Sequence, residues 1–272
     1  MKVEFFDSHA HYDDEKFDED REKLIKDIYE FGITSFVSAG YNVESSKKGL
    51  QLSHENRYIY TISGISPNDV GQTIGETDEQ IKKIENLVYE EISDSKKQNK
   101  NSKIVAIGEI GLDYYWNKEN KEIQKHAFIE QIKLANKYNL PIVIHTREAV
   151  MDTLDIIKNV QPANNKGIFH CCPLNREFVK EGLKLGFYIS FAGPVTFKNS
   201  KNAEEIVQMV PLDKILIETD SPYLAPEPKR GTRNDSRNVK YIAGKIAEIK
   251  NMNIEDIAHI TYTNAMRIFN IK

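Results

Sequence analysis

The chain has 272 residues, 40% of them hydrophobic and 29% charged, and a net charge of −4. This length suffices for one α/β barrel or two smaller domains, and the charge argues against a protein that coats nucleic acid through bulk electrostatics. No stretch approaches the roughly 20 apolar residues of a membrane helix, and Met1–Asp7 has no signal-peptide pattern. The two cysteines, Cys171 and Cys172, are adjacent and cannot link distant parts of the chain, so we expect a reduced, cytoplasmic protein. We also expect no membrane partner.

Short apolar runs rich in β-branched residues alternate with longer amphipathic stretches along the chain. Continuous apolar runs are typical of strands buried on both faces, and helical crossovers between them indicate a parallel sheet. The predicted strands are, in chain order, Val3–Phe6, Thr34–Ser38, Tyr58–Ser63, Ile104–Ile107, Ile142–Ile144, Gly167–Phe169, Phe187–Phe191 and Ile215–Ile217. The predicted helices are Asp18–Phe31, Val43–Ser53, Asp78–Ser93, Lys121–Tyr138, Ala149–Asn159, Asn175–Lys184, Ala203–Met209, Val239–Ile249 and Ile254–Phe269.

About eight repeats of strand and helix predict an α/β protein with a (β/α)₈ TIM-type barrel and C-terminal helices. A doubly wound open sheet is the alternative, because counting strands does not by itself close a barrel. The sequence contains no internal repeat and no long linker, so we expect a single domain over residues 1–272. The polar stretch Asp94–Lys103 lacks apolar periodicity and is predicted to be a solvated loop.

Histidines and acids stand where several predicted strands end. Residues two apart in a strand face the same side, so His9 and His11 can point at one ion, and Asp7 precedes them as a candidate hydrogen-bond partner for an imidazole. In barrels the carboxyl ends of different strands converge at the active site. Taken singly, these residues also fit helix caps, ion pairs or hydrogen-bonded structural histidines. The candidate ligands are His9, His11, Glu109, His145, His170 and Asp220.

Taken jointly, these six residues predict a binuclear metal site. Mixed histidine and carboxylate ligation suits Zn²⁺ or Mn²⁺, or Mg²⁺ with a more oxygen-rich sphere. Two such ions about 3.5–4 Å apart activate water and stabilise charge on a leaving oxygen. The other three histidines, His54, His126 and His259, fall in helical patterns and are expected at ordinary surface or core positions.

Over nearly its whole length the sequence resembles the TatD family of metal-dependent deoxyribonucleases, within the amidohydrolase-like barrels. The resemblance rests on Asp7-Ser-His-Ala-His11, Gly108-Glu-Ile-Gly-Leu-Asp-Tyr-Tyr115, Pro141-Ile-Val-Ile-His-Thr-Arg147, Phe169-His-Cys171, Glu218-Thr-Asp-Ser-Pro-Tyr-Leu-Ala-Pro226 and Arg230-Gly-Thr-Arg-Asn234. It implies that the six residues are the metal ligands, that Glu109 bridges two divalent ions, and that Asp220 is also the general base. It further implies hydrolysis of DNA phosphodiesters, often from the 3′ end of single strands.

The chain departs from the family's pattern at two places. Family members usually carry histidine in a Gly-x-His-Pro turn, where this chain has Ser66 in Gly64-Ile-Ser-Pro67. That histidine is associated with substrate phosphate, so the change concerns rate or substrate choice rather than the ligand set. After His170-Cys171 the family tends to have Phe-Ser-Gly, where this chain has Cys172-Pro173-Leu174.

Basic and aromatic residues near these motifs suggest how a nucleic acid is held. Arg147 follows His145, and a basic segment with Lys229, Arg230, Arg233 and Arg237 follows the eighth predicted strand, where barrels often bind phosphate. An arginine grips phosphate bidentately, so we predict phosphate contacts by Arg147, Arg230 and Arg233; the alternative is a solvated basic loop.

Three aromatic residues, Tyr114, Tyr115 and Trp116, lie close after Glu109. Aromatic faces stack on unpaired bases with about 1–3 kcal/mol per base, although loop aromatics also commonly cover the edge of a core. The adjacent cysteines belong to no Cys-x-x-Cys pattern, and packing is their expected role.

Three functions stay open at this point. The first is a metal-dependent 3′–5′ exonuclease on single-stranded DNA, in which Asp220 accepts a proton from the attacking water. The second keeps the barrel but cleaves an amide or ester, for example as a D-aminoacyl-tRNA deacylase, because the same activated water attacks a carbonyl carbon. The third, suggested by Ser66, is a catalytically weakened barrel that binds nucleic acid.

Overall fold

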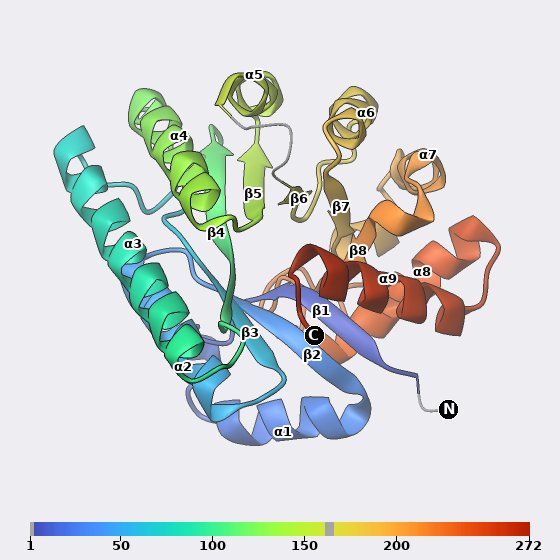
Figure 1. Cartoon of the computed structure of the whole chain (residues 1–272). Coiled ribbons are helices and arrows are strands. Elements are labelled where there is room, and N and C mark those ends of the chain that lie inside the picture. Colours follow the sequence, from blue (N-terminus) through green and yellow to red (C-terminus); the bar gives the residue numbers. More distant parts are fainter. Residues whose placement is uncertain (1–2, 161–165) are drawn as a thin grey trace. The chain divides into compact units, whose positions relative to one another are not determined.

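The computed structural model describes residues 3–160 and 166–272 (Figure 1). The eight strands follow one another in a single sheet in the order of the sequence. A doubly wound sheet would show a reversal of strand order, so the sequential order excludes that alternative and agrees with the predicted TIM-type barrel. The strands are β1 Phe5–Ala10, β2 Ile33–Ala39, β3 Ile59–Ser63, β4 Ile104–Asp113, β5 Ile142–Arg147, β6 Gly167–Phe169, β7 Tyr188–Phe191 and β8 Ile215–Ile217.

Helices connect the strands, as the sequence predicts, and two further helices follow β8. Within the described ranges, no helix combines the length and apolar character of a membrane span. The α-helices are α1 Arg21–Phe31, α2 Val43–Glu55, α3 Ile74–Lys97, α4 Lys121–Tyr138, α5 Val150–Val160, α6 Arg176–Lys184, α7 Ala203–Met209, α8 Val239–Lys250 and α9 Ile254–Ile268. Short 3₁₀ turns are η1 Glu15–Phe17, η2 Gly193–Thr196, η3 Leu212–Lys214 and η4 Ser236–Asn238.

The chain divides into two compact units, which are described separately. The first unit comprises Met1–Ser38 and His170–Arg267 and contains β1, β7, β8 and most of β2. In it β1 pairs in parallel with β2, β7 pairs with β8, and an isolated parallel bridge joins Ala10 to Ser221 just after β8. Helix α8 packs against β1 and β8 and places an apolar face on the core of this unit.

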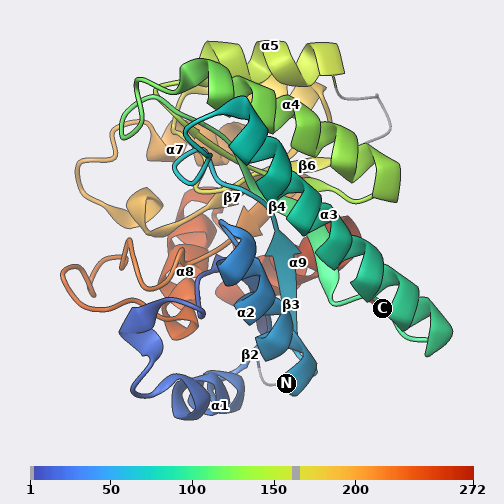
Figure 2. The same cartoon turned by 90° about the vertical axis from the view of Figure 1, so that its left-hand side faces the viewer.

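The second unit comprises Ala39–Phe169 and Ile268–Lys272 and contains β3 to β6. Its ten-residue strand β4 is buried throughout and pairs in parallel with β3 and β5. Helices α3 and α4 pack side by side, which both views show (Figures 1 and 2). The polar residues Glu109 and Asp113 of β4 are therefore buried.

Three strands extend beyond their predicted ends, and each extension contains a candidate site residue. Strand β1 runs to Ala10, β4 to Asp113 and β5 to Arg147, so His9, Glu109 and His145 lie within strands and not beyond their ends. The prediction stopped each strand at its first polar residue or glycine. In β1, for example, the polar side chains are buried and hydrogen-bonded: the Ser8 hydroxyl donates to the carbonyl of Ile217 and lies 3.1 Å from the Ser190 hydroxyl.

The predicted loop Asp94–Lys103 is wrong in its first part, because α3 continues to Lys97. The same helix begins at Ile74, four residues before the predicted start. Thr73 caps it by accepting from the backbone N–H of Glu76, which satisfies a donor that the first turn leaves open. Lys97 pairs with Asp94 one turn earlier, so this polar stretch forms an exposed, charged last turn of helix.

Candidate metal centre

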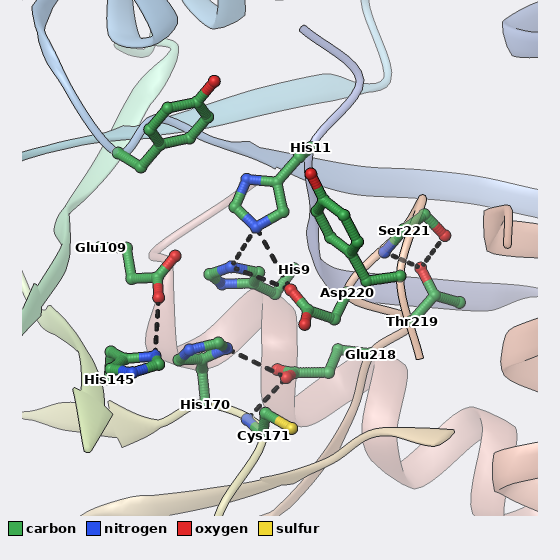
Figure 3. Close-up of polar contacts among 12 residues, drawn as sticks. His9, His11, Glu109, His145, His170, Cys171, Glu218, Thr219, Asp220 and Ser221 are labelled. Carbon is green, nitrogen blue, oxygen red and sulfur yellow. Dashed lines mark hydrogen bonds and ion pairs between the residues drawn. The ribbon is translucent and has the colours of Figure 1, made fainter. Parts of the chain in front are cut away.

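In the first unit, His9 of β1 and His11, which follows that strand, meet an aspartate that follows β8 (Figure 3). The Nε2 atoms of His9 and His11 lie 3.3 Å apart, and the Oδ1 atom of Asp220 lies 3.2 Å from Nε2 of His11 and 3.8 Å from Nε2 of His9. A proton on one ring nitrogen can satisfy only one neighbour, whereas one divalent cation accepts lone pairs from all three atoms. These three residues therefore fit a metal ion.

Backbone hydrogen bonds fix Asp220 against β1. Its N–H donates to the carbonyl of His9 at 2.9 Å, and the N–H of His11 donates to the carbonyl of Ser221 at 2.7 Å. Burial by itself raises the pKa of the Asp220 carboxyl, but the hydrogen bond with His11 and the neighbouring imidazoles of His170 and His9 hold that pKa below its ordinary value. Asp220 is thus an ionised carboxylate, as a cation ligand must be.

His170 follows β6 and belongs to the same unit, where its ring stacks on that of His9 with centroids 4.1 Å apart. Its Nδ1 atom lies 3.2 Å from Oε1 of Glu218, and the same oxygen accepts from the backbone N–H of Cys171 at 2.6 Å (Figure 3). The fully buried Glu218 therefore holds Nδ1 as a donor and leaves the Nε2 lone pair of His170 for a ligand. The sequence suggested Glu218 only as part of a motif.

In the second unit, Glu109 of β4 and His145 of β5 form a pair, with 3.0 Å between Oε1 of Glu109 and Nδ1 of His145 (Figure 3). The opposite ring nitrogen, Nε2, lies 3.0 Å from Oδ2 of the buried Asp113. Burial raises the pKa of Asp113, yet the hydrogen bonds from His145 and from the backbone of Trp116 and Tyr115 bring it down to about 2. This carboxylate therefore orients His145 with Nδ1 toward Glu109.

The prediction that Asp7 hydrogen-bonds an imidazole is wrong. Its buried carboxylate accepts from the backbone N–H and the hydroxyl of Thr219, from the Ser236 hydroxyl, and from the backbone N–H of His9. Burial raises the pKa of Asp7 to about 7, against the opposing effect of the hydrogen bonds from Ser236 and Thr219. Asp7 thus holds the backbone around the His9 and Asp220 segments in place.

The three arginines predicted to bind phosphate differ in whether their guanidinium groups already have a carboxylate partner. In the first unit, Arg233 donates from both terminal nitrogens to Asp20, at 2.9 and 2.6 Å, and Arg230 lies 3.8 Å from Glu227. In the second unit, the exposed Arg147 stacks its guanidinium on an aromatic ring and has no carboxylate partner among the residues that the structure describes. Arg147 thus has the most available charge of the three.

The residues that depart from the family's pattern make local contacts. The buried Ser66 hydroxyl donates to Oδ2 of Asp69 at 2.7 Å and accepts from the backbone N–H of Asn68. Cys172 is buried, which raises the pKa of its thiol, and its N–H donates to the carbonyl of Ser190. The burial of Cys172 agrees with the packing role that the sequence suggests.

Grouped imidazole and carboxylate donors on a TIM-type barrel suit a catalytic metal ion of the kind that metal-dependent hydrolases use. Residues 6–270 match the family described as TatD-related DNase, and the chain belongs to this family. It is 42% identical over 266 residues to an uncharacterised metal-dependent hydrolase, YabD, of Bacillus subtilis, covering 98% of this chain and 99% of that one. An uncharacterised metal-dependent hydrolase of Methanocaldococcus jannaschii is 32% identical over 267 residues, covering 98% and 97%.

Solved structures bear on the fold. The crystal structure of a TatD homologue of Escherichia coli, YJJV, superposes with a TM-score of 0.87 over 100% of both chains at 22% identity. This similarity confirms the predicted (β/α)₈ barrel with its C-terminal helices.

Proposed function

We propose that this hydrolase cleaves DNA phosphodiester bonds, as a 3′–5′ exonuclease on single-stranded DNA, with two divalent ions that are Mg²⁺, Mn²⁺ or Zn²⁺. The observation that carries the proposal is the convergence of two Nε2 atoms and one carboxylate oxygen, from His9, His11 and Asp220, within 3.8 Å of one another. Membership of the TatD-related DNase family supports DNA as the substrate.

In this proposal the whole chain acts as one domain, and six residues hold the ions. His9, His11, His170 and Asp220 of the first unit and Glu109 and His145 of the second would be the ligands, and the family resemblance implies the bridging role of Glu109. The ions, when bound, lower the pKa of water and neutralise charge on a phosphate. Glu218 and Asp113 hold the imidazoles of His170 and His145 with the coordinating nitrogen free of a proton.

The remaining steps belong to side chains of this protein. Asp220 accepts the proton of the attacking water, for which its ionised carboxylate has the required form. Arg147 binds a non-bridging phosphate oxygen, together with Arg230 and Arg233 if the Asp20 and Glu227 pairs open. Because the Arg233 pair is bidentate, we expect Arg147 to contribute the larger share of phosphate binding.

The test is hydrolysis of a single-stranded oligonucleotide labelled at either end, by protein stripped of metal with a chelator and then given Mg²⁺, Mn²⁺ or Zn²⁺. We expect metal-dependent shortening from the 3′ end, lost in His145→Ala and in Asp220→Ala. His126→Ala is the matched control, because His126 lies on α4 and pairs with Asp78 at the surface. Full activity of Asp220→Ala would overturn the role of Asp220.

A parallel reaction with acylated tRNA separates the two hydrolase chemistries. Deacylation without cleavage of DNA would replace the nuclease by a carbonyl hydrolase on the same barrel. Stoichiometric metal binding without turnover of either substrate would leave a barrel that only binds nucleic acid.

A further inference from the structure

Two aromatic residues are exposed directly after β4, in the second unit. The side chain of Trp116 is 69% exposed and that of Tyr115 is 42% exposed, and their rings meet edge to face with centroids 4.7 Å apart. An indole ring with more than two thirds of its surface in water has at least one open face. The Trp116 ring therefore does not serve to cover the edge of the core, which is the usual role of loop aromatics.

A cation lies against the same two rings. The guanidinium of Arg147 stacks over the ring of Tyr115, 3.9 Å from its centroid, and lies 5.4 Å from the centroid of Trp116. Arg147 is the last residue of β5 and pairs in register with Asp113 at the end of β4. It stands two residues after His145, a candidate metal ligand, so the aromatic pair and its cation adjoin that ligand within one unit.

Hydrogen bonds also fix the backbone of the segment that carries the two rings. Oδ1 of the buried Asp113 accepts from the N–H groups of Tyr115 and Trp116, both at 2.9 Å, while its Oδ2 atom bonds to His145. The N–H of Tyr114 donates to the carbonyl of Arg147. One carboxylate thus fixes both the start of the aromatic segment and the orientation of a candidate ligand.

We propose that Trp116 and Tyr115 form a stacking platform for an unpaired nucleobase of the substrate, with Arg147 gripping the adjoining phosphate. An exposed aromatic face beside a free guanidinium matches the alternation of base and phosphate along a single strand. A paired base keeps its faces covered by its neighbours in the duplex, so the platform selects single-stranded DNA. This inference rests on the proposed function and adds to it the residues that bind a base of the substrate.

Trp116 is the only tryptophan in the chain, so its fluorescence reports on the platform alone. The probe is the metal-loaded full chain titrated with a short single-stranded oligonucleotide whose phosphorothioate linkages slow hydrolysis. A second oligonucleotide has the same backbone but abasic sites in place of the bases. We expect saturable quenching by the first and little quenching by the second. The abasic strand should bind about 5- to 150-fold more weakly for each base that stacks.

Variants separate stacking from phosphate binding, with affinity measured by anisotropy of labelled oligonucleotides. Trp116→Ala should lose affinity for the base-bearing strand but not for the abasic one, and Trp116→Phe should restore part of the loss. Arg147→Gln should weaken binding of both strands alike. Tyr89→Ala is the matched control, because Tyr89 is an aromatic residue on α3 whose 59% exposure lies between those of Trp116 and Tyr115.

Equal quenching by the two strands, or unchanged affinity of Trp116→Ala for the base-bearing strand, would overturn the platform. Such a result would leave the proposed nuclease intact, because cleavage of the unmodified strand is measured separately. Conversely, quenching that depends on bases, without cleavage in the presence of any metal, would retain the platform and refute the nuclease.

Discussion

Substitution of Asp113 by asparagine tests how this protein sets the protonation of a candidate metal ligand. The Oδ1 atom of Asp113 accepts from two backbone N–H groups, and its Oδ2 atom bonds to Nε2 of His145. The asparagine amide keeps the two backbone hydrogen bonds if its single oxygen takes the place of Oδ1. Its NH₂ group then faces Nε2 of His145, which must become the acceptor.

A neutral imidazole with Nε2 as acceptor carries its proton on Nδ1. In this protein Nδ1 of His145 is the atom that lies 3.0 Å from Oε1 of Glu109. The Asp113→Asn substitution therefore moves a proton onto the nitrogen that faces the proposed bridging ligand. Metal binding then requires that proton to leave, because an imidazole coordinates through a lone pair.

The expected loss of metal affinity follows from one hydrogen bond. When Nδ1 of His145 gives up its proton to bind the metal, Nε2 carries the proton of the imidazole and loses its hydrogen-bond acceptor. A hydrogen bond to a charged group contributes about 1.5–3 kcal/mol, and the amide cannot accept from Nε2 while it also serves the two backbone groups. We therefore expect metal affinity to fall by about 10- to 150-fold. The free energy of unfolding of the metal-free protein should fall by only about 1 kcal/mol, because the backbone hydrogen bonds persist.

The assay is competition for Mn²⁺ or Zn²⁺ between the protein and a chromophoric chelator, with urea unfolding of the metal-free variant in parallel. Asp78→Asn is the matched control: it removes an aspartate–histidine pair of the same unit, between Asp78 and His126, at 2.6 Å on the surface. Metal affinity equal to that of the wild type in Asp113→Asn would refute the reasoning about the tautomer. A large loss of stability without metal would show that asparagine does not preserve the backbone contacts.

Three further predictions concern other parts of the chain. Glu218→Gln should weaken metal binding by about 10- to 100-fold in the same competition assay, because the amide polarises Nδ1 of His170 less than a carboxylate does; unchanged affinity would contradict the pairing. Gly193→Ala should destabilise the protein by about 1–3 kcal/mol in urea unfolding, because the added methyl group would overlap the carbonyl oxygen of Leu224; equal stability would show that the loop moves freely. Burial lowers the pKa of Lys103 from 10.5 to about 8, so the unfolded chain holds more protons between these values, and the wild type should gain stability relative to Lys103→Met as the pH rises through this window; a constant difference between pH 7.5 and pH 10 would refute it.

The fold was largely predictable from the sequence because strand and helix signals alternate without interruption. Helix Lys121–Tyr138 and strand Ile215–Ile217 have the predicted bounds. The errors arise where tertiary contacts outweigh local polarity. Strand β1 continues through three polar residues, since the Asp7 and Ser8 side chains find partners in segments more than 180 residues away in the sequence. No window of neighbouring residues contains that information.

The candidate site was predictable in its histidines but not in the acids that orient them. His9 and His11 carry a local signal, since their spacing puts both on one side of a strand. Glu218 and Asp113 carry no such local signal, because each orients a histidine that is distant in the sequence. Glu218 lies 48 residues from His170, and Asp113 lies 32 residues from His145. A buried carboxylate in hydrogen-bond contact with a histidine ring is a structural signal, and it appears only when the strands are brought together.

Ser66 bears on the proposed binding of phosphate. Its hydroxyl donates to Asp69 and accepts from the N–H of Asn68, so its one donor is used within its own turn. The Asn68 amide of this turn lies 3.4 Å from Oδ2 of Asp113, the carboxylate that also bonds to His145. A serine in this role stabilises the turn and supplies no positive charge. If a phosphate binds on this unit, the charge that a histidine would bring must come from another side chain, and the phosphate contact proposed for the exposed Arg147 would supply it.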